Sequence, residues 1–178
     1  MIELFYDSYS VAYFIVSQEM GTKTMMEFLE TLYFEEYAYL HPDYKGYKRA
    51  FISDVLYWTD YLIDKDKLDK EFPAIERDFK ATGRKFVREN LMSDFPEFDL
   101  FFMIMRLRIL YVADQGYIRM KLRTLLRHYG YKRRSKEIVN HLNRCMIFYH
   151  IQPYLRDYEQ CDVGKVDIDD MITFRAEK

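Results

Sequence analysis

The stretch that decides the fold covers residues 121–148 and reads KLRTLLRHYGYKRRSKEIVNHLNRCMIF. Its first half carries leucines at helical spacing and ends at Gly130, a residue type that commonly terminates helices. Ser135 then predicts a helix start, because a serine hydroxyl accepts a hydrogen bond from a free first-turn N–H group. The stretch therefore predicts two helices joined by a tight turn, the second running from Lys136 to about His150.

The second of these helices has one apolar and one polar face. Residues at spacings of three and four form the face that we expect to be buried, namely Ile138, Leu142, Cys145, Met146 and Tyr149. The opposite face carries Lys136, Asn140, Asn143 and Arg144, with His141 beside them. Side chains of these polar types pair with the base edges of DNA, Asn with adenine and Arg or Lys with guanine.

Further elements flank the two helices. An apolar helix is expected over residues 98–112, before a turn. Residues 117–122 alternate between apolar and cationic side chains, which fits either a short strand or the start of a helix. Two short strands are predicted after the second helix, over residues 153–158 and 166–175.

This order of elements over residues 98–176 resembles the winged helix-turn-helix DNA-binding proteins. The resemblance implies that the helix at about 136–150 is a recognition helix that lies in the major groove. The base-contacting residues would then be Lys136, Asn140, His141, Asn143 and Arg144. The phosphate-contacting residues would be Arg119, Lys121, Arg123, Arg127, Lys132, Arg133, Arg134 and Lys165.

The distribution of charge supports an anionic partner. Residues 1–100 carry a formal charge of −8, residues 101–150 carry +9 and residues 151–178 carry −3. A basic block inside a nearly neutral chain favours contact with something anionic over a merely solvated helix face. The predicted wing, which consists of the two strands after the second helix and the loop between them, departs from this pattern because it is acidic. Its carboxylates are Asp157, Glu159, Asp162, Asp167, Asp169 and Asp170.

The N-terminal half is expected to be a bundle of three or four helices. A first helix would end near Gly21, a second would start at Thr22 or Thr24 and end at His41-Pro42, and a third would cover 47–63. A fourth would begin near Pro73. The predicted fold is mainly α, a helical N-terminal bundle followed by a winged-helix-like module with a small antiparallel β-hairpin. We expect an acidic helical domain over 1–95, for dimerisation, effector or partner binding, and a basic DNA-binding domain over 96–178.

Enzymatic and metal-binding functions lack their usual patterns. The sequence has no phosphate-binding Gly-rich loop, no G-x-S-x-G elbow and no H-E-x-x-H motif, so we expect no enzyme. Zinc ligands would have to come from His141, Cys145, His150 and Cys161, which lack the paired Cys-x-x-Cys spacing. The aspartates at 167–170 lack the central Gly and terminal Glu of a calcium loop. We therefore expect no metal and no cofactor.

The favoured function is sequence-specific binding of double-stranded DNA by a homodimeric transcriptional regulator. One alternative is a protein–protein adaptor that uses the same shape, and another is a DNA-binding protein of replication or mobile-element maintenance. An acidic N-terminus unlike a secretory signal, two cysteines and apolar runs too short to span a membrane predict a cytoplasmic protein without membrane contact.

Overall fold

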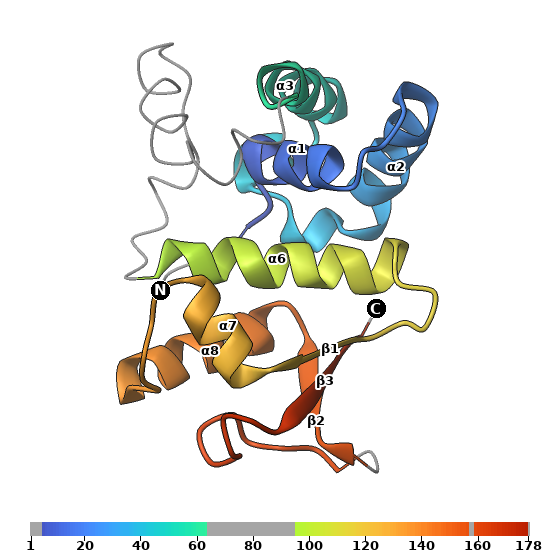
Figure 1. The fold of residues 1–178 in the computed structure, drawn as a ribbon. Helices are drawn as coiled ribbons and strands as arrows, with labels where there is room; N and C mark the ends of the chain where they lie inside the picture. Colours follow the sequence, from blue (N-terminus) through green and yellow to red (C-terminus); the bar gives the residue numbers. More distant parts are fainter. Residues whose placement is uncertain (1–4, 64–94, 157–158, 178) are drawn as a thin grey trace. The chain divides into compact units, whose positions relative to one another are not determined.

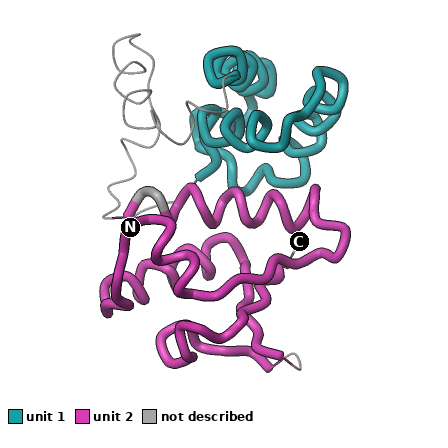
Figure 2. Tube along the Cα trace, in the orientation of Figure 1, with its two compact units in different colours: residues 1–92 teal, residues 93–178 magenta. Residues whose placement is uncertain are grey.

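A computed structural model of the protein describes residues 5–63, 95–156 and 159–177. Within them the fold is mainly helical, with a small three-stranded antiparallel sheet. The chain divides into two compact units, residues 1–92 and 93–178, which Figure 2 colours teal and magenta. The sequence placed its domain boundary between residues 95 and 96. The predicted helix beginning near Pro73 lies outside the described residues.

The described part of unit 1, residues 5–63, is helical. In chain order its helices are α1 (Ser8–Ser17), α2 (Thr22–Glu35), η1 (Tyr37–Tyr39), η2 (Pro42–Tyr44) and α3 (Lys48–Tyr61), the η elements being short 3-10 helices. The side chain of Asp7 caps α1 by accepting a 2.6 Å hydrogen bond from the amide of Ser10. Helix α1 packs against α3, where Tyr9 and Trp58 meet edge to face.

Buried tyrosines connect the elements of unit 1 through their hydroxyl groups. Tyr6 donates to the Glu36 carboxylate at 2.9 Å, and Tyr33 donates to the backbone carbonyl of Tyr44 at 2.9 Å. The Tyr44 hydroxyl lies 2.9 Å from the Ser8 hydroxyl, and burial raises the pKa of Tyr44 above its usual value. These polar tips are thus satisfied inside the unit, as buried polar groups must be.

Two details of the predicted second helix were wrong. Gly21 occupies the N-cap position of α2, and Thr22 is already helical, so no threonine hydroxyl caps the helix. Helix α2 also ends at Glu35, before the predicted stop at His41-Pro42, because the chain tightens into η1 and η2 there.

Unit 2 contains three helices and three strands in its described residues (Figure 1). They are α6 (Pro96–Tyr111), β1 (Ile118–Lys121), α7 (Leu122–His128), α8 (Lys136–Phe148), β2 (Ile151–Tyr154) and β3 (Met171–Ala176). Strand β3 lies between β1 and β2 and is antiparallel to both. The register of the sheet pairs Phe174 of β3 with Ile118 of β1 on one side and with Pro153 of β2 on the other. Pro153 is tolerated because β2 is an edge strand.

The core of unit 2 lies between α6, α8 and one face of the sheet. Phe98, Phe102, Leu142, Ile172 and Phe174 are almost fully buried there.

One cation is buried with this core. Arg106 of α6 is only 1% exposed, and it donates hydrogen bonds to the carbonyls of Tyr149 (2.6 Å) and Glu177 (2.7 Å). This guanidinium therefore ties the end of α8 and the end of the chain to α6.

The predicted strands were misplaced by several residues. Strand β2 begins at Ile151 rather than Pro153, and β3 begins at Met171 rather than Val166. Residues 166–170 alternate like a strand but form turns, because the Asp167 side chain accepts a hydrogen bond from the Asp169 amide at 2.8 Å. The ambiguous segment 117–122 is divided between β1 and the first turn of α7.

None of the helices in the described part of the chain is long and apolar enough to cross a membrane.

Candidate nucleic-acid interface

Helix α8 and the turn before it form as the sequence predicted. Gly130 has a φ of +82°, a left-handed conformation that lets α7 end and the chain turn. The Ser135 hydroxyl accepts a 3.3 Å hydrogen bond from the Ile138 amide and caps α8. The five residues predicted to form the apolar face of this helix segment are all buried, so the polar face points away from the core.

Cationic and amide side chains are exposed along that polar face. Lys136, Asn140 and Arg144 are all exposed, four residues apart, which places them on one side of α8 over about 12 Å. Lys132 and Arg133 are exposed in the turn just before the helix. We refer to these five residues, Lys132, Arg133, Lys136, Asn140 and Arg144, as the α8 surface.

One carboxylate stands at the start of the α8 surface. Glu137 is exposed, and its pKa is lowered by hydrogen bonds from its own backbone N–H and from the Ser135 hydroxyl. Its negative charge in the first turn of α8 therefore interacts favourably with the positive end of the helix dipole.

The structure corrects the predicted set of base-contacting residues at one position. His141 is only 5% exposed, and its Nε2 lies 2.6 Å from Oδ1 of Asp99 on α6. It cannot reach DNA from inside the core, because it lies on the flank of α8 that packs against α6. Asn143 is half-buried, at the edge of the polar face.

Two of the predicted phosphate contacts are engaged inside the protein. Arg134 donates from Nη1 to the carbonyls of Val163 (3.0 Å) and Val166 (2.5 Å). Arg123 forms a two-pronged pair with Asp169, at 2.5 and 2.7 Å. Both guanidinium groups donate hydrogen bonds to the loop between β2 and β3, so they stabilise the fold rather than stand ready for a phosphate.

The remaining predicted phosphate contacts are exposed but lie on different elements. Lys121 and Arg127 are exposed at the two ends of α7, and Lys165 lies in the β2–β3 loop within 3.6 Å of Asp162. Arg119 lies on the outward face of the sheet. There it helps to line an open cavity of about 450 Å³. The cavity is also lined by Tyr117, Tyr154, Leu155, Arg156, Thr173 and Arg175.

The acidic β2–β3 loop packs against α7, α8 and the turn between them. Besides its bonds to Arg123 and Arg134, it packs against α8 at Gly164, where an added Cβ would lie 3.1 Å from Cγ1 of Val139. Sequence reasoning missed these contacts because they join residues that are between 25 and 46 positions apart. The one sequence feature that could have indicated them is that an acidic loop follows soon after a basic block along the chain.

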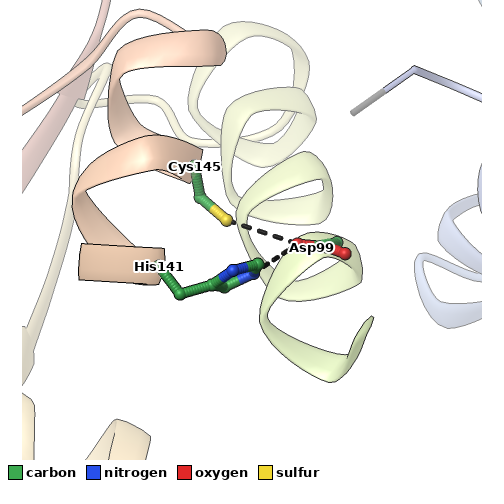
Figure 3. Close-up of side chains that lie close together, drawn as sticks. All are labelled: Asp99, His141 and Cys145. Carbon is green, nitrogen blue, oxygen red and sulfur yellow. Dashed lines mark hydrogen bonds and ion pairs between the residues drawn. The ribbon is translucent and has the colours of Figure 1, made fainter. Parts of the chain in front are cut away.

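A second group of chemically active side chains lies between α6 and α8 (Figure 3). The Oδ1 atom of Asp99 is 2.6 Å from Nε2 of His141 and 3.5 Å from Sγ of Cys145. Burial, followed by the nearby Asp99 carboxylate, raises the pKa of the Cys145 thiol. In the described residues the other two zinc candidates stand apart from this group. His150 is exposed and Cys161 lies in the β2–β3 loop.

Searches against protein-family models, curated proteins and solved structures each gave no match to this chain.

Proposed function

We propose that this protein binds double-stranded DNA in a sequence-specific manner and acts as a transcriptional regulator. The observation that carries the proposal is the α8 surface, an exposed row of cationic and amide side chains on a helix whose other side is firmly buried. The order of elements along unit 2, namely α6, β1, α7, α8, β2 and β3, also supports the proposal, because the resemblance to winged helix-turn-helix proteins rests on such an order along the chain.

The dimensions and chemistry of α8 suit the major groove. The groove is about 12 Å wide, and an α-helix with side chains is about 10–12 Å in diameter. Asn140 offers a bidentate pair to adenine, while Lys136 and Arg144 offer donors to guanine. Lys132 and Arg133 precede the helix, where they would contact phosphates and set its register.

The β2–β3 loop would act differently from a DNA-contacting wing. Its aspartates bring negative charge, and its hydrogen bonds to Arg123 and Arg134 hold it against the protein. We assign it a supporting role, in which it holds the turn before α8 in place. Lys165, with an exposed side chain, is the one cation of this loop that the proposal retains as a phosphate contact.

Unit 1 would supply dimerisation or effector binding. Its helices α1, α2 and α3, with the turn between α1 and α2, line a cavity of about 470 Å³, a volume in the range of small-molecule sites. Phe34 and Tyr47 are about two-thirds exposed, which leaves aromatic surface for a partner or a second copy. A homodimer is proposed because operator symmetry usually mirrors protein symmetry.

The test is a selection of bound sequences from randomised DNA duplexes, followed by fluorescence anisotropy on the selected duplex. Lys132→Ala combined with Arg133→Ala should weaken binding to all duplexes alike. It should also reduce the salt slope by about 0.9 for each lost phosphate contact. Asn140→Ala should instead lower the preference for the selected sequence by about 1–3 kcal/mol.

A single-charge control in unit 1 separates this surface from general electrostatic attraction. Arg49 is an exposed arginine of α3 in unit 1, so Arg49→Ala should leave affinity and salt slope unchanged. Equal losses for Arg49→Ala and for the double variant would remove the α8 surface from the proposal. No binding at about 50 mM salt would favour the adaptor function instead.

A further inference from the structure

The group formed by Asp99, His141 and Cys145 contains three side-chain types that bind metal ions. His141 and Cys145 are four residues apart on α8, one helical turn, so both project toward α6 from the same side. Asp99 reaches them from the first half of α6. One ligand atom of each residue lies within 4.8 Å of the other two. Figure 3 shows the three side chains converging between the two helices.

The environment of this group is dry and leaves one oxygen without a hydrogen bond. Asp99, His141 and Cys145 are 3%, 5% and 0% exposed. Oδ2 of Asp99 is buried and has no hydrogen-bond partner among the described residues. The rings of Phe95 and Phe98 lie 5.3 and 6.5 Å from the His141 ring, so the surroundings are largely aromatic. A carboxylate in such surroundings is costly unless a positive charge compensates it.

A divalent cation would balance the charges of these ligands. A carboxylate, a thiolate and a neutral imidazole together carry two negative charges, which a +2 ion neutralises. Nε2, Sγ and one carboxylate oxygen would supply three ligand atoms, the number that proteins give to Zn²⁺ sites in which a water molecule takes the fourth position. Thiolate and imidazole ligands select Zn²⁺ and similar transition metals over Mg²⁺ and Ca²⁺.

We propose that Asp99, His141 and Cys145 form a buried site for a divalent transition metal of the Zn²⁺ class, which clamps α8 to α6. On binding, the thiol of Cys145 releases its proton to solvent, and so does the imidazole if it is protonated. The ion takes the place of the hydrogen bond between Nε2 and Oδ1. Their separation must widen from 2.6 Å. At ordinary Zn–N and Zn–O lengths, tetrahedral ligand atoms lie roughly 3.3 Å apart.

The experiment uses the full chain after chelator treatment. Zn²⁺ is titrated in competition with a chromophoric chelator, and Co²⁺ is titrated separately because its absorption spectrum reports thiolate ligation. We expect one ion per chain and a thiolate-to-cobalt band. Cys145→Ser and His141→Gln should each weaken binding by more than about 100-fold, since loss of a ligand exceeds loss of an outer contact.

Cys161→Ser is the matched control, because Cys161 is the other cysteine of the chain and lies in the β2–β3 loop. It should bind Zn²⁺ like the unaltered protein. Absence of uptake by the unaltered chain, a Co²⁺ spectrum without the thiolate band, or loss of binding in Cys161→Ser would each overturn the proposal. The first two results come from the unaltered protein, so a folding defect in a variant does not obscure them. None of them depends on whether the protein binds DNA.

Discussion

Arg133 and Arg134 are neighbours in the sequence, yet the structure gives them different roles. Arg133 is exposed in the turn before α8, whereas Arg134 is half-buried and donates hydrogen bonds to the carbonyls of Val163 and Val166. Arg134→Ala should therefore destabilise unit 2. Arg133→Ala should weaken DNA binding and leave the free energy of unfolding within about 0.5 kcal/mol of the unaltered value.

The size of the Arg134 effect follows from its two hydrogen bonds. A hydrogen bond from a charged donor contributes about 1.5–3 kcal/mol when it is well shielded. Because the Arg134 side chain is partly exposed, solvent replaces some of this loss, and we expect about 2–4 kcal/mol for the pair. With a urea m-value of about 2 kcal/mol/M, the midpoint should fall by roughly 1–2 M.

Urea unfolding followed by far-ultraviolet circular dichroism measures this shift, and hydrogen exchange locates it. The amides of Lys165 and Val166 both donate to the carbonyl of Asp162, so Arg134→Ala should speed their exchange. Unchanged stability and unchanged exchange in Arg134→Ala would refute the structural role. If DNA binding fell at the same time, Arg134 would be a phosphate contact after all.

Three further predictions concern the fold of unit 2. Gly130→Ala should lower the free energy of unfolding by about 1–2 kcal/mol in urea titrations, because position 130 has a φ of +82°. Phe174→Ala should cost about 3–5 kcal/mol by the same measurement, since Phe174 is 1% exposed at the centre of the sheet. Arg123 holds the pKa of Asp169 below its usual 3.8, so this carboxylate stabilises the fold above that pH and the contribution is lost as the pH falls through its lowered pKa. The difference in unfolding free energy between the unaltered protein and Asp169→Asn should thus be constant above about pH 5 and shrink in more acidic buffers.

Local patterns were sufficient to predict the helices of unit 2. The cap at Ser135, the stop at Gly130 and the buried stripe of α8 all depend on residues close in sequence. Each follows from backbone hydrogen bonding and helical periodicity, which the sequence displays directly. The exposed polar face of α8 could be predicted for the same reason.

Long-range partners explain what the sequence did not reveal. His141 looks like a surface residue from its neighbours on α8, but Asp99, which lies 42 positions earlier, draws it into the core. Residues 166–170 look like a strand until the turn at Asp167 and the bond from Arg134 to Val166 are known. For His141 a polar contact across the fold decides between two patterns that local periodicity permits, whereas at residues 166–170 a local turn at Asp167 acts together with such a contact.

The most direct test of DNA binding by α8 is an amide NMR titration of the full chain with a duplex selected for binding. We predict that the largest chemical-shift changes fall between Lys132 and Arg144, and that they diminish in Asn140→Ala. Shift changes confined to the outward face of the sheet, around Arg119 and Arg175, would contradict the account. They would place the nucleic acid on the sheet of unit 2 instead of on the α8 surface.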